Sequence, residues 1–61
     1  MSLPPGIFRI CTAIMDVIDD GGQIDPKLEE ATSRLFKASL DKTAGNAKDI
    51  ALVKAYADKN F

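Results

Sequence analysis

Three aspartates, Asp16, Asp19 and Asp20, stand close enough in the sequence to form a paired carboxylate site for general acid–base catalysis. Such chemistry needs a cleft that shifts the pKa of one carboxyl and a positioned partner group. The chain has no His, a single Cys and no glycine-rich loop for a phosphate. The composition therefore predicts that the protein is not an enzyme, and we interpret the aspartates as a solvated acidic helix end.

These acids belong to MDVIDDGGQIDPKLEE, residues 15–30, whose DGGQID core joins two expected helices. The core resembles the calcium loop of EF-hand proteins, and it also resembles the turn of tellurite-resistance B-like helical proteins. An EF-hand loop has glycine sixth, a hydrophobic residue eighth and a bidentate Glu twelfth. With Gly22 sixth, Ile24 falls eighth, but Val17 takes the first ligand position and Leu28 the twelfth. We predict no metal site and no cofactor, and keep a degenerate EF-hand-like calcium-binding helical pair as the lesser alternative.

Cys11 is the only cysteine, so no disulfide can form within one chain. A reactive thiol needs exposure and a nearby cation or helix N-terminus. Arg9 is close in sequence but lies on another face of the expected helix, so we expect Cys11 to be buried and inert. A chain of 61 residues without a disulfide or a zinc site depends on helix packing or self-association for its stability.

The charges are balanced, with eight Lys and Arg against nine Asp and Glu. Nucleic-acid binding needs clustered positive charge, which this composition does not favour. Three short helices can nevertheless include a helix-turn-helix, so a helix-turn-helix-type DNA-binding regulator remains the first alternative function. The apolar N-terminal stretch is shorter than the roughly 20 residues of a membrane span. We therefore expect a cytoplasmic protein with no membrane partner.

Start and stop residues divide the chain into helices. Pro4 and Pro5 begin the first helix, and Asp25 is a good N-cap for the second. Gly45 is the expected left-handed residue after the second helix, and Asn46 or Thr43 caps the third. The expected helices span about residues 4–18, 26–42 and 46–59 of a single domain, 1–61.

The pattern predicts an all-α fold, a small bundle of two to three helices with the first helix central, completed by self-association. The bundle has two helices rather than three if one helix continues across residues 43–46. Oppositely charged residues four apart, such as Glu30–Arg34, Lys37–Asp41 and Lys54–Asp58, are expected to pair on helix surfaces. Leu35 and Val53 lie on the core stripes of the later helices, and Leu40 widens the first of these stripes.

The first helix differs because it is apolar nearly all round, and such a helix must be covered on more than one side. Two further helices of about 15 residues leave a contiguous apolar patch, which usually marks an interface. We therefore predict a small non-enzymatic interaction module or assembly subunit whose partner is itself, as a homo-oligomer, or another protein. The predicted interface consists of Ile7, Phe8, Ile10, Cys11, Ile14, Met15, Val17 and Ile18.

Overall fold

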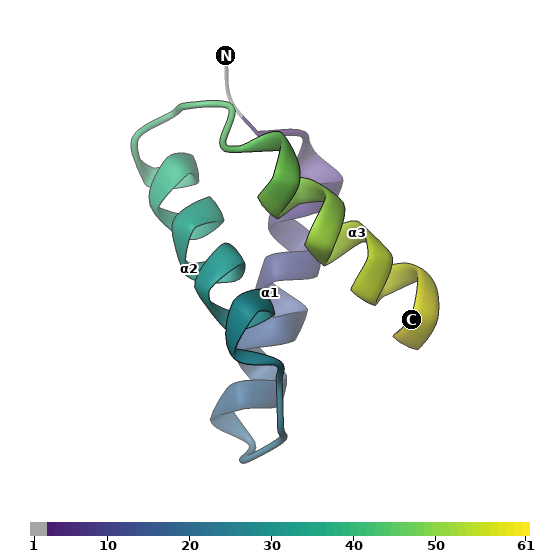
Figure 1. The fold of residues 1–61 in the computed structure, drawn as a ribbon. Coiled ribbons are helices and arrows are strands. Elements are labelled where there is room, and N and C mark those ends of the chain that lie inside the picture. The colour runs from purple at the N-terminus through teal and green to yellow at the C-terminus, as the bar shows by residue number, and fades with distance from the viewer. Residues whose placement is uncertain (1–2) are drawn as a thin grey trace.

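Three helices form the described part of the chain, residues 3–61, in the computed structural model. They are α1 (Pro5–Asp19), α2 (Pro26–Leu40) and α3 (Ala47–Asn60), and each packs against the other two (Figure 1). The all-α bundle is thus confirmed. A continuous helix across residues 43–46 is wrong, because α2 and α3 are separate. The expectation that the first helix is central is also wrong, because the most extensive contact joins α2 and α3.

The turn between α1 and α2 follows from Gly21, Gly22 and Asp25. Gly21 has a φ of +83°, and the N–H of Gly22 donates to the carbonyl of Val17 at 2.8 Å. This Schellman geometry satisfies carbonyls that a helix end leaves free. Asp25 then caps α2, since its carboxylate accepts a hydrogen bond from the backbone N–H of Lys27 at 2.8 Å. Both the glycine exit and the Asp25 cap are confirmed.

α2 ends at Leu40, two residues before its expected end, and a lysine takes the left-handed position. Lys42 has a φ of +58°, and the N–H of Thr43 donates to the carbonyl of Ala38 at 2.8 Å. Gly45 also has a positive φ, +77°, but it lies farther along the loop and does not end the helix. Asn46 caps α3 by accepting from the N–H of Lys48 at 2.7 Å.

Lys42→Gly is expected to raise the free energy of unfolding by about 0.5–1 kcal/mol, because glycine adopts positive φ without a Cβ clash. Urea denaturation followed by circular dichroism measures this change. Lys37→Gly, inside α2, is the matched control and is expected to lower the free energy of unfolding by about 1 kcal/mol. Equal losses in both variants would contradict the role given to position 42.

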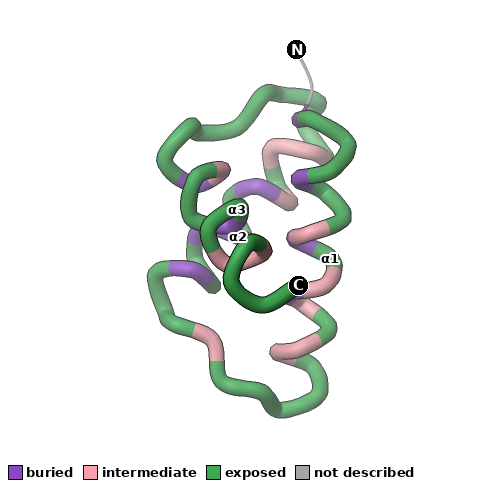
Figure 2. The backbone as a smooth tube through the Cα atoms, turned by 90° about the vertical axis from the view of Figure 1, so that its right-hand side faces the viewer, coloured by how far each residue is buried: buried purple, intermediate pink, exposed green. Residues whose placement is uncertain are grey.

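The core lies between the three helices, and the buried segments in Figure 2 face one another across it. Ile14, Leu35 and Val53 supply one fully buried side chain from each helix. Leu3 closes the core at the end where the N-terminus meets the α2–α3 loop, beside Gly45. The buried apolar residues are Leu3, Ile7, Cys11, Ile14, Leu28, Ala31, Leu35 and Val53.

Two polar residues also belong to the buried set. Thr32 is fully buried, and its hydroxyl donates to the carbonyl of Leu28 at 2.8 Å, so burial leaves no unpaired donor. Asp49 is the other, and it pairs with α2 as described below. Leu40, by contrast, does not widen the core stripe. It is 83% exposed, and at five residues after Leu35 it lies about 140° around α2 from that buried side chain.

Candidate functional site

The predicted interface residues on α1 divide into core residues and surface residues. Ile7, Cys11 and Ile14 are buried within a single chain. The remaining α1 residues keep part of their surface free: Phe8 is 43% exposed, and the half-buried ones are Ile10, Met15, Val17 and Ile18. Thus α2 and α3 cover one broad side of α1 and leave apolar surface along both flanks of that side.

One flank carries an apolar patch between α1 and α2. The rings of Phe8 and Phe36 meet edge to face, with centroids 5.4 Å apart and planes at 78°. Leu40 follows Phe36 by one turn and so lies on the same side of α2. We call Phe8, Phe36 and Leu40 the α1–α2 patch. Because Leu40 projects from the surface beside an aromatic pair, the patch offers both a protruding side chain and an apolar surface to receive one.

The other flank carries a concave apolar groove between α1 and α3, which we call the α1–α3 groove. Its volume is about 250 Å³. Of the described residues that line it, Lys54 on the α3 side is the one that carries a charge. Gly6 lines the α1 side, and a Cβ built there would meet nothing within 4 Å. The full lining is Pro4, Gly6, Ile7, Ile10, Ile50 and Lys54.

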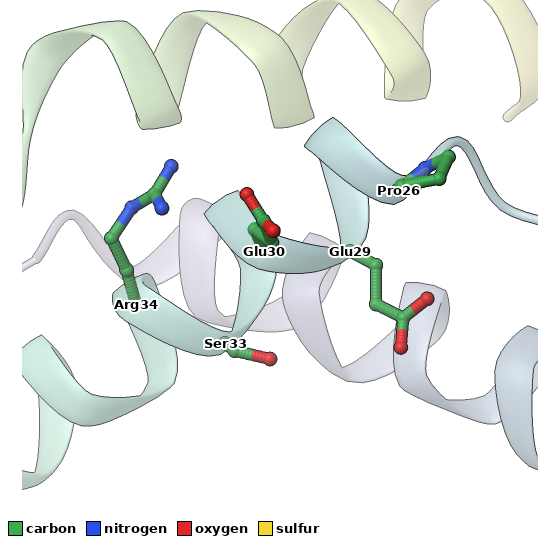
Figure 3. Close-up of a pocket in the computed structure, with 5 residues that line it drawn as sticks. All are labelled: Pro26, Glu29, Glu30, Ser33 and Arg34. Atoms are coloured by element: carbon green, nitrogen blue, oxygen red, sulfur yellow. The ribbon is translucent and has the colours of Figure 1, made fainter.

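A second hollow, of about 470 Å³, lies along the N-terminal half of α2 (Figure 3). Its lining residues are Pro26, Glu29, Glu30, Ser33 and Arg34. Figure 3 shows Glu30 and Arg34 extending toward α3, whereas Ser33 and Glu29 extend away from it. The chain has no histidine that could accept the proton of the Ser33 hydroxyl, so this hollow lacks the Ser–His arrangement that activates a nucleophile.

Arg34 at the edge of this hollow is bound to Asp49 of α3. Its Nε and Nη2 donate to the two carboxylate oxygens, each at 2.9 Å. The Asp49 side chain is 6% exposed and that of Arg34 is 57% exposed. The hydrogen bond from Arg34 holds the pKa of Asp49 below its ordinary value, although burial opposes this shift. The pair therefore fastens α2 to α3 and leaves neither group free for proton transfer.

The sequence pattern predicted a different partner for Arg34. Glu30 was expected to pair with Arg34, but the Arg34–Asp49 bridge is the one ion pair within 4 Å among residues 3–61. The pairs Lys37–Asp41 and Lys54–Asp58 are likewise not formed there. The sequence feature that indicates the Arg34–Asp49 pair is the position of Asp49. It lies four residues before Val53 and hence on the buried stripe of α3. A charge on such a stripe requires a partner from another helix.

The other residues considered for chemistry, Cys11 and the three aspartates, do not line this hollow. Cys11 is buried, as expected, and burial raises the pKa of its thiol above the ordinary value, which disfavours the reactive thiolate. Asp16, Asp19 and Asp20 are exposed at the end of α1. Across the described residues, no three His, Cys, Asp or Glu side chains gather in a way that could hold a metal ion.

The connection between α2 and α3 bears on the DNA-binding alternative. Residues 41–46 separate the two helices, whereas a helix-turn-helix usually has a turn of about three or four residues. Lys48, Lys54 and Lys59 are exposed on α3, but so is Asp58.

From residue 3 to residue 61, no helix has both the length and the apolar character needed to cross a bilayer. Comparisons with protein-family models, curated proteins and solved structures find no match for this chain.

Proposed function

We propose that this chain is a non-enzymatic interaction module that self-associates through the α1–α2 patch. The observation that carries the proposal is the exposure of Leu40, at 83%, beside the partly exposed pair Phe8 and Phe36. Fully burying one such side chain contributes roughly 1.5–3 kcal/mol before entropic costs. Two copies related by a twofold axis would bury the patch twice, each Leu40 against the partner's aromatic pair.

Self-association through the patch also suits a fold of this size, whose own core is small. A chain near 60 residues buries only about 60% of the surface that its unfolded form exposes, so added burial matters to its stability. The core of this bundle has no disulfide to assist it, since Cys11 is the only cysteine. No observation on the described residues gives comparable support to DNA binding or to calcium binding.

Light scattering coupled to size-exclusion chromatography tests the proposal, with the chain loaded from micromolar to near-millimolar concentration. We expect the mass to rise from the 6.6 kDa of one chain toward twice that value. Phe8→Ser and Leu40→Ser are expected to shift the association midpoint at least roughly tenfold higher, since about 1.4 kcal/mol of lost burial is a factor of ten.

Leu52→Ser on α3 is the matched control, because Leu52 is 42% exposed, nearly the same as Phe8, but lies outside the patch. It should leave the association midpoint unchanged. A monomer at every concentration would refute self-association. An equal effect of Leu52→Ser and Phe8→Ser would refute the assignment of the patch.

A further inference from the structure

The α1–α3 groove offers a second surface, independent of the proposed self-association. It is concave, and Ile7, Ile10 and Ile50 supply apolar walls. At about 30 Å³ for each water-sized group, its volume of about 250 Å³ holds roughly eight heavy atoms, or about two leucine side chains. It is smaller than the roughly 300–1,000 Å³ typical of small-molecule pockets. The size therefore suits side chains of a docking peptide better than a drug-sized ligand.

Lys54 favours a negatively charged group on whatever binds in the groove. Among residues 3–61 it is the only charged residue that lines the groove. Its ammonium has no carboxylate within 4 Å among the described residues, because the ion pair expected with Asp58 is not formed. An unpaired cation beside an apolar groove is complementary to a carboxylate next to apolar side chains, and such complementarity selects partners by charge.

We infer that the α1–α3 groove binds an acidic amphipathic peptide segment of another protein, with two apolar side chains between α1 and α3 and a carboxylate on Lys54. This is the helix-in-groove mode, in which residues one turn apart on the bound helix supply the anchors. The inference rests on the lining and charge of this groove alone. It does not depend on the α1–α2 patch, which lies on the other flank of α1.

The test uses two synthetic helical peptides and the full chain labelled with ¹⁵N. One peptide has two leucines a turn apart flanked by glutamates, and its twin has lysines in place of the glutamates. With the glutamate peptide, we expect saturable shifts of the backbone amide signals centred on Ile10, Ile50 and Lys54. The lysine twin should bind at least roughly tenfold more weakly, a difference of about 1.4 kcal/mol.

Two variants connect this binding to the groove. Gly6→Leu should weaken binding of the glutamate peptide at least roughly tenfold, because the new side chain enters open space and occupies the groove without meeting another atom at its Cβ. An otherwise unchanged amide spectrum verifies that this variant folds. Lys54→Glu should reverse the preference, so that the lysine peptide binds better. Phe8→Ser, on the opposite flank, should leave binding unchanged.

Four results would overturn the inference. Equal binding of the two peptides would remove the charge assignment. Shifts centred on Phe8 and Phe36, or binding that survives Gly6→Leu, would place the peptide elsewhere. Concentration-dependent shifts of Ile10 and Ile50 without any peptide would mean that a second copy of this chain occupies the groove.

Discussion

Leu35→Ala is expected to lower the free energy of unfolding by about 2–5 kcal/mol, the range for a buried leucine cut back to alanine. Leu35 is fully buried on α2, the helix that has the most extensive contact with α3. At about 0.05–0.15 kcal/mol per residue, a chain of 61 residues has roughly 3–9 kcal/mol in total. The variant should therefore lose about a fifth or more of its stability, and can unfold altogether.

The same substitution at Leu40 supplies the control. Leu40 lies on the same helix but is 83% exposed, so Leu40→Ala should change the free energy of unfolding by no more than about 0.5 kcal/mol. Thermal and urea unfolding of both variants, at a concentration where the chain is monomeric, gives the comparison. Similar losses in the two variants would contradict the placement of the core.

Arg34→Met is expected to reverse the direction in which the contribution of Asp49 to folding stability changes with pH. In the native chain the hydrogen bond from Arg34 lowers the pKa of Asp49 in the folded state. The folded state then binds fewer protons than the unfolded state in the acid range. The contribution of Asp49 is present above the ordinary aspartate pKa of about 3.9, and is lost as the pH falls through the lowered folded pKa.

Without Arg34, the effect that remains on Asp49 is desolvation, which raises the pKa of a carboxyl. The folded state would then hold its proton more firmly than the unfolded state. The contribution of Asp49 would be intact below a pH of about 3.9 and would fall as the pH rises toward the raised folded pKa.

Urea denaturation from about pH 3 to about pH 6, a range that spans the ordinary aspartate pKa, measures how the stability of each chain depends on pH. The stability gap between the native chain and Arg34→Met should widen as the pH rises. Asp49→Asn, alone and combined with Arg34→Met, removes the titrating carboxyl and serves as the control. The gap between these two control variants should stay flat across the same pH range. Parallel pH curves for the native chain and Arg34→Met would contradict the assignment.

The sequence predicted the features of this fold that depend on neighbouring residues. Asp25 with Pro26, and Asn46 before an alanine-rich run, are local signals for a helix start, and both caps are confirmed. The end of α2 was placed too late because Lys42 gives no sign of its left-handed conformation. A non-glycine residue takes that conformation only when the surrounding turn, here the bond from Thr43 to Ala38, holds it there.

Features that depend on distant residues were not predictable in the same way. The Arg34–Asp49 pair joins residues 15 apart in sequence, across two helices. Periodicity predicts an apolar stripe on α2, but not the angle at which its neighbours meet it, so Leu40 was assigned to the core. For α1 the pattern indicated a helix covered on more than one side. Which of its residues contact another chain stays a prediction.

Gly45 sets a limit on how this sequence can diverge during evolution. A Cβ at this position would lie 2.9 Å from side-chain atoms of both Leu3 and Leu35, and its φ of +77° also disfavours any larger residue. Gly6 has open space around it and is under no such restriction. Selection on position 45 is therefore tied to positions 3 and 35: a side chain at position 45 requires the δ-methyl groups of both leucines to shift, and it must also adopt a left-handed backbone that L residues rarely take.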